Sequence, residues 1–316
     1  MGNKSVTKFV ESDSQQLDTD NAKKYDPAQV DELFRSGNFS KAKSICKQYL
    51  TTEPHACYSL GNYWATSDYY GEKAQKYFNM GIQLKDANCC KGSADLYFKG
   101  INNSLTNDLA EVQRQTAIDL YTKYIELSSE KDVKYYKIIG NLHYDSLCMC
   151  WGKNNRKYEL ENKLVIEWLE KYISSITTKE ISKEDVSTIY HLAYCYQSVN
   201  MDKTLEYYKM IFYSGIPSHI HSIEYNILKY ICEILLNDRY DKNDKEIFEW
   251  FKKCVEKELK DSKFLMASAL FKIKQYAKAK EFCLLAERET CDHTLIKKCQ
   301  NLLSKILLEC DNLDLK

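Results

Sequence analysis

The segment 56–82 constrains the fold of this chain more than any other part of the sequence. It reads as two short helical halves joined by a polar turn, and small residues at Gly61, Ala74 and Gly81 allow two helix backbones to approach closely. Large apolar side chains stand next to these positions: Leu60, Tyr77 and Phe78. A helix pair of this size cannot bury its apolar face alone, so it must stack on further pairs.

Further pairs are visible as repeats of one pattern. The segments 39–46 and 276–283 share an aromatic residue, Lys-Ala-Lys and a cysteine at identical offsets. The position of Ala42 recurs at spacings of 32 to 47 residues, as Ala74, Ala117, Leu164, Thr204, Ile247 and Ala279. We therefore predict seven helix pairs, each of these positions lying in the second helix of its pair, and a closing helix at about 292–310. Strict alternation of apolar and polar residues is absent, which argues against strands.

The N-terminal residues differ from the rest. Residues 1–25 are polar and lack sustained periodicity, so we predict a disordered tail. Asp26 is placed to cap a helix that begins at Pro27, with Gln29 at the capping-box position. We therefore divide the chain into a tail, 1–25, and one helical repeat domain, 26–316.

Composition narrows the classes of function. Lysine plus arginine and aspartate plus glutamate both number 45, so the net charge is zero and the basic field typical of nucleic-acid-binding proteins is absent. No apolar run is long enough to span a bilayer, and the N-terminus lacks the core of a signal peptide. We expect a monomer in the cytoplasm or nucleus.

The thirteen cysteines mostly fall inside apolar helical patterns, so we interpret them as small buried hydrophobic residues rather than a disulfide framework. For the neighbours Cys89 and Cys90 we expect one side chain inside and one outside.

Several hairpins carry a family resemblance. Phe39, Ala42, Cys46 and Pro54 match the spacing of a tetratricopeptide repeat, and the segment that begins Ala56-x-x-x-Leu60-Gly61 resembles the related Sel1-like repeat. The resemblance implies an all-α fold: a right-handed α-solenoid of about seven antiparallel helix pairs plus a C-terminal capping helix. It also implies that the chain binds proteins or peptides in a concave groove lined by the first helix of each pair.

The same resemblance places candidate residues in that groove. Setting Ile139-Gly140 on the Leu-Gly pair of the repeat points one row of side chains into the groove, and the next pair adds a second row. The candidates are Lys134, Lys137, Asn141 and Tyr144, followed by Tyr190, His191 and Tyr194. Lys137-x-x-x-Asn141 resembles part of the clamp by which some tetratricopeptide proteins hold a C-terminal carboxylate. The second asparagine and the matching basic residues of that clamp are missing, so an acidic chaperone tail is an alternative to a protein segment held among tyrosines.

Chemical motifs point away from catalysis. Phosphate-binding, dinucleotide-binding, zinc-protease and serine-hydrolase signatures are absent. His143 with Cys148 and Cys150, and His219 with His221, lack the partners that would complete a tetrahedral metal site. We expect no enzyme activity, no cofactor and no metal.

Gly2 is a possible site of myristoylation, but the motif requires Ser or Thr at position 6, where this chain has Val6. We therefore expect no membrane attachment unless Gly2 is myristoylated.

The leading hypothesis for the function is a protein-binding scaffold or adaptor. An RNA-binding helical repeat protein is the alternative, and the neutral charge disfavours nucleic acid as a partner.

Overall fold

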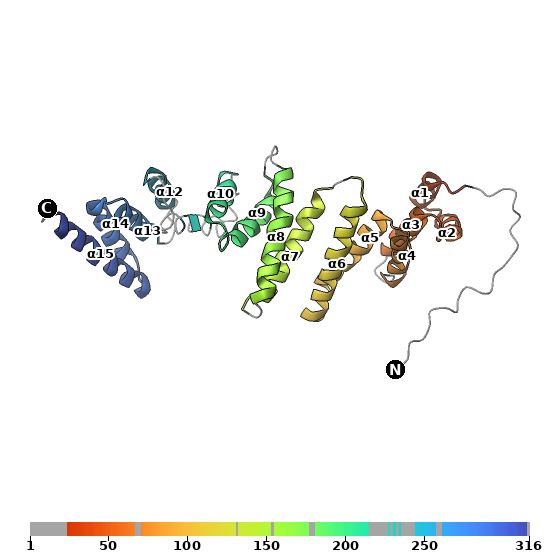
Figure 1. Cartoon of the computed structure of the whole chain (residues 1–316), viewed down its shortest axis with the longest axis horizontal. Helices are drawn as coiled ribbons and strands as arrows, with labels where there is room; N and C mark the ends of the chain where they lie inside the picture. The colour runs from red at the N-terminus through yellow and green to blue at the C-terminus, as the bar shows by residue number, and fades with distance from the viewer. Residues whose placement is uncertain are drawn as a thin grey trace, which may run out of the picture. The chain divides into compact units, whose positions relative to one another are not determined.

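The computed structural model describes residues 24–66, 71–130, 132–152, 155–176, 181–214, 227, 230–231, 234, 244–256 and 261–314 (Figure 1). These residues form helices and turns, with no strand among them. The helices are α1 (Pro27–Arg35), α2 (Phe39–Gln48), α3 (Pro54–Ala65), α4 (Gly71–Gln83), α5 (Ala87–Asn102), α6 (Asn107–Leu127), α7 (Lys134–Cys150), α8 (Asn155–Ser175), α9 (Lys183–Tyr196), α10 (Met201–Tyr213), α12 (Asp244–Glu256), α13 (Ser262–Lys272), α14 (Tyr276–Glu289) and α15 (His293–Asp314). Within the described ranges, no helix is long and apolar enough to cross a membrane.

The helices pack as antiparallel neighbours, as the repeats predicted. The single domain predicted for 26–316 corresponds to two compact units, residues 1–131 with α1 to α6 and residues 132–316 with α7 to α15. Inside a unit the first helices of successive pairs also contact each other, as α1 with α3, α3 with α5, and α7 with α9. The seven positions equivalent to Ala42 fall in the even-numbered helices from α2 to α14, and α15 is the predicted closing helix.

The first helix begins where the sequence indicated. Asp26 accepts hydrogen bonds from the backbone nitrogens of Ala28 (3.0 Å) and Gln29 (3.3 Å), and Pro27 occupies the first helical position. Tyr25, which we assigned to the tail, is buried and its hydroxyl lies 2.8 Å from Nδ1 of His55. The packed part of the chain therefore includes Tyr25. The predicted disorder of residues 1–23 lies outside the described residues.

One aromatic ring joins two successive pairs of the first unit. Phe78 of α4 is fully buried, and its ring lies against Gly61 of α3 and Gly92 of α5. A Cβ atom at Gly61 would stand 2.4 Å from Cε1 of Phe78, and one at Gly92 would stand 2.5 Å from the same atom. Because both distances are far inside van der Waals contact, only glycine allows α3 and α5 to approach this ring so closely.

The second unit repeats this contact with a shift in register. A Cβ atom at Gly140 of α7 would stand 2.2 Å from Cδ2 of Leu169 in α8, as one at Gly61 would meet Phe78. Ala74 precedes Phe78 by four residues, so its structural equivalent in α8 is Val165, four residues before Leu169. Val165 is fully buried, whereas Leu164 is only half-buried. Our assignment of Leu164 was therefore one residue off.

Cysteines fill narrow spaces between helices. Of the eleven described cysteines none is disulfide-bonded, and eight are buried. Burial raises the pKa of the Cys46 and Cys57 thiols to about 11 each, so both stay protonated at neutral pH. Our expectation that one of Cys89 and Cys90 faces outward was wrong. Both are fully buried, because α5 is covered by α4 on one side and α6 on the other.

Three turns adopt the same left-handed conformation with different residues. Gly37 (φ +78°), Lys85 (φ +59°) and Lys274 (φ +62°) each follow a helix. At each turn the next residue's backbone nitrogen donates to the carbonyl five residues before it, as Gln275 does to Leu270 (2.8 Å). Glycine adopts this conformation without the steric cost that a Cβ atom brings.

Replacing Gly61 with alanine should lower the free energy of unfolding by about 1–3 kcal/mol. The added methyl group would overlap the ring of Phe78, and the ring has little room to move because it also lies against Gly92. Urea denaturation checks this expectation. Gly71→Ala is the matched control, since nothing lies within 4 Å of a Cβ atom there. Equal stability of the two variants would contradict the packing described for Phe78.

Replacing Lys274 with glycine should raise the free energy of unfolding by about 0.5–1 kcal/mol, because relief of the left-handed strain exceeds the added entropy of the unfolded chain. Lys278→Gly, in the helical part of α14, should instead destabilise by a similar amount. Thermal unfolding distinguishes the two, and a loss of stability in Lys274→Gly would refute the strain at this turn.

Candidate functional site

All seven candidate residues lie on α7 and α9, two first helices that contact each other in the second unit. Lys134 is exposed at the start of α7, and the other six side chains are half-buried. Leu142, Leu192 and Ala193 of the same helices are buried in the core. The candidate positions therefore lie at the edge of the core, and Tyr144 and Tyr190 pack against it.

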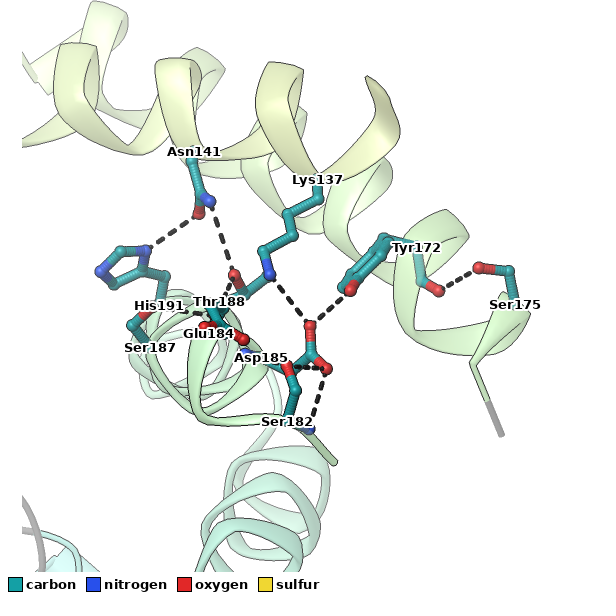
Figure 2. A network of polar contacts seen from close by, with 10 residues as sticks. All are labelled: Lys137, Asn141, Tyr172, Ser175, Ser182, Glu184, Asp185, Ser187, Thr188 and His191. Atoms are coloured by element: carbon teal, nitrogen blue, oxygen red, sulfur yellow. Dashed lines mark hydrogen bonds and ion pairs between the residues drawn. The ribbon is translucent and has the colours of Figure 1, made fainter. Parts of the chain in front are cut away.

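The N-terminal ends of the two helices are joined by a network around one carboxylate (Figure 2). Nζ of Lys137 donates to Oδ1 of Asp185 at 2.9 Å, and the hydroxyl of Tyr172 donates to the same oxygen. Oδ2 of Asp185 accepts from the backbone nitrogen (3.0 Å) and the hydroxyl (2.7 Å) of Ser182. Ser182 and Asp185 also form the capping box that starts α9, so the helix terminus itself fixes this carboxylate.

This carboxylate remains ionised and satisfies Lys137. Burial alone would raise the pKa of Asp185, but hydrogen bonds from Tyr172, Ser182 and Lys137 outweigh it and lower the pKa to about 2. Asn141 is engaged as well, because its Nδ2 donates to Oγ1 of Thr188 (3.5 Å) and its Oδ1 lies 3.1 Å from Nδ1 of His191. A carboxylate of the chain itself therefore occupies the place that the clamp hypothesis gives to a partner.

The C-terminal half of the same face is aromatic. The rings of Tyr144 and His191 stack with centroids 3.8 Å apart, and Tyr194 meets Tyr144 edge-on at 6.1 Å. Trp151, directly after α7, lies 6.0 Å from Tyr194 and is 66% exposed. Burial lowers the pKa of His191 to about 4, so this ring is neutral at physiological pH. We define Tyr144, Trp151, His191 and Tyr194 as the aromatic surface.

The structure thus brings together Lys137, Asn141, Tyr144, His191 and Tyr194, but not the other two candidates. Tyr190 packs 6.0 Å from Tyr208, which in turn stacks on Tyr230. The ammonium of Lys134 lies 5.5 Å from the ring of Tyr135, at the exposed start of α7.

Sequence reasoning also missed Trp151. It follows Tyr144 by seven residues, a spacing that places two residues on one helix face, and that signal could have identified it.

The described metal candidates are His143, Cys148 and Cys150. Nδ1 of His143 lies 2.7 Å from Oε2 of Glu161 in a buried pair between α7 and α8. Cys150 is buried, whereas Cys148 is exposed. Among the described residues no group of three or more His, Cys, Asp or Glu side chains could hold a metal ion. His219 and His221 lie outside the described residues.

Comparisons with known proteins find helical repeat structures. The TPR domain of P58(IPK) matches with 13% identity over 90% of this chain and 79% of that chain, at a TM-score of 0.32. A Sel1 repeat protein from Oxalobacter formigenes matches with 12% identity over 84% of this chain and 100% of that chain, at a TM-score of 0.34. The protein c5321 is a protective antigen of uropathogenic Escherichia coli strains with an SLR fold. It matches with 12% identity over 89% of this chain and 68% of that chain, at a TM-score of 0.32. No protein-family model and no curated protein matches the chain.

Replacing Asp185 with asparagine should lower the free energy of unfolding by about 2 kcal/mol at pH 7, because the charged hydrogen bonds to Lys137 and Tyr172 are lost. The folded-state pKa lies below the unfolded value, so this stabilisation is complete above about pH 4 and is lost as the pH falls through 2. Urea unfolding measures how much less stable Asp185→Asn is than the wild type, and this difference should be smaller at pH 2.5 than at pH 7 by roughly half or more.

Glu167→Gln is the matched control, because Glu167 forms a surface pair with Lys171 one turn away. It should cost less than about 0.5 kcal/mol at either pH. A stability difference for Asp185→Asn that does not change with pH would rule out an ionised carboxylate at the centre of this network.

Proposed function

We propose that this protein is a non-catalytic scaffold that binds a segment of another protein on the aromatic surface of α7 and α9. The observation that carries the proposal is the exposed ring of Trp151 beside three further rings on one face. Tryptophan and tyrosine dominate the energetics of protein interfaces, because they bury large areas and keep a polar edge for hydrogen bonding. The tetratricopeptide-like and Sel1-like residues of the hairpins support the same class of function.

The electrostatics of this face favour an uncharged partner segment. Lys137 is neutralised by Asp185, and His191 is neutral at physiological pH. A carboxylate tail or a phosphate backbone would find no unpaired charge at these two positions, and the whole chain has zero net charge. Apolar and aromatic side chains, with main-chain groups that reach the tyrosine hydroxyls, complement the aromatic surface best.

Replacing Trp151 and Tyr194 together with alanine should weaken capture of the principal partner at least about tenfold without unfolding the protein, since such interface anchors contribute 1–2 kcal/mol or more each. Affinity purification from ribonuclease-treated lysate with quantitative mass spectrometry compares the variant with the wild type. Leu160→Ala, which also removes an exposed apolar side chain but from α8, is the control.

A partner captured equally by all three proteins would contradict the role of the aromatic surface. Capture that disappears on ribonuclease treatment of the wild type would favour the RNA-binding alternative.

A further inference from the structure

The first unit contains a groove that the proposed function does not use. It has a volume of about 750 Å³ and lies over the N-terminal half of α4, the C-terminal half of α5 and the start of α6. Its walls carry three primary amides, Gln75 and Asn79 from α4 and Gln113 from α6, and α5 contributes the half-buried side chains of Leu96 and Tyr97.

Hydrogen bonds inside the unit fix how two of these amides point. Nε2 of Gln75 donates to Oδ1 of Asn79 at 2.8 Å and to the hydroxyl of the buried Ser93 at 2.7 Å. Both donor hydrogens of Gln75 are therefore committed, which leaves its Oε1 as an acceptor. In the same way Asn79 uses its oxygen and keeps its Nδ2 donors. Neither Oε1 of Gln75 nor Nδ2 of Asn79 bonds another residue in the part of the chain that the structure describes.

An acceptor and a donor held side by side are complementary to a peptide group. Every residue of an extended chain except proline offers one N–H and one C=O on the same edge, and one amide pair can satisfy both. Ligands that carry a net charge would need an opposite charge, which this pair lacks. The groove's charged residues, Glu72 and Lys76, have opposite signs and lie one helical turn apart on the rim. The groove is therefore suited to a neutral ligand with alternating donors and acceptors.

The amide that α6 contributes is also hydrogen-bonded, and an apolar side chain lies one turn before it. Oε1 of Gln113 accepts from the hydroxyl of Ser104 at 2.6 Å, and its amide lies so close to Gly100 that a Cβ atom there would stand 2.9 Å from Nε2. Leu109, one turn before Gln113 on the same side of α6, is 46% exposed. An extended segment in the groove could thus pack apolar side chains on Leu96, Tyr97 and Leu109 while its main chain bonds the amides.

We propose that this amide groove is a second protein-binding site, which holds an extended peptide segment through its main chain. Recognition through main-chain groups tolerates many sequences, and the apolar lining selects segments with aliphatic or aromatic residues at alternate positions. The groove belongs to the first unit and shares no residue with the aromatic surface of the second unit. The groove and the aromatic surface have only the proposed class of function in common, so an experiment can disprove one site without disproving the other.

A phage-displayed library of random dodecapeptides, selected on the full-length protein, tests this site. Enriched peptides are synthesised and their Kd values measured by fluorescence anisotropy on the wild type, Asn79→Leu, Gln75→Leu and the protein with Trp151 and Tyr194 both replaced by alanine. Asn79 is exposed, so its replacement keeps the fold even if the loss of the bond from Gln75 to Ser93 disturbs the other variant. The matched control is Gln115→Leu, which removes an amide paired with Asp119 on the exposed face of α6.

The expected result is a set of peptides that lose at least tenfold in affinity with Asn79→Leu and less than twofold with Gln115→Leu. Methylation of one or more main-chain nitrogens of these peptides should weaken binding by at least tenfold, more than replacement of most side chains by alanine.

Peptides that depend on Trp151 and Tyr194, and not on Gln75 or Asn79, would overturn the groove while supporting the aromatic surface. Peptides that bind all variants equally would overturn the groove. A library that yields no binder would overturn the groove, because main-chain recognition should accept many sequences, and would leave the aromatic surface to the partner-capture experiment.

Discussion

The insertion of Phe78 between Gly61 and Gly92 is the contact on which the arrangement of the first unit depends. The ring belongs to the second helix of one pair, and it packs on the first helices of that pair and of the next. Neither pair therefore has a complete core without the other. This coupling through nearest neighbours brings the first helices of successive pairs into contact, α3 with α5 here and α7 with α9 in the second unit.

Contact between successive first helices also determines what the second unit can offer a partner. Rows of side chains on α7 and α9 lie next to each other, and they change from ionic at one end to aromatic at the other. The ionic end ties the two helices together, whereas the aromatic end leaves Trp151 exposed. The contacts that hold the two helices together and the surface proposed for recognition thus lie at opposite ends of one face.

The sequence predicted those features that depend on neighbouring residues. The cap at Asp26, the close approach at Gly61 and the burial of Ala42 follow from local spacing, and all three are present. Features that depend on residues far apart could not be predicted in this way. Lys137 finds its partner 48 residues later, and nothing around Lys137 identifies Asp185. The register of α8 was missed for a related reason. The helices α7 and α8 have 17 and 21 residues where α3 and α4 have 12 and 13, and only the contact of Gly140 with Leu169 reveals the shift.

The resident carboxylate of Asp185 has a consequence for selectivity in a crowded cell. Every polypeptide ends in a carboxylate, so a bare ammonium and amide one helical turn apart would attract the termini of countless unrelated chains. Asp185 meets Lys137 intramolecularly, at an effective concentration that no cellular pool of termini approaches. Asp185 thereby keeps chain termini from Lys137, and under the proposed function discrimination is left to the shape of the aromatic rings beside it.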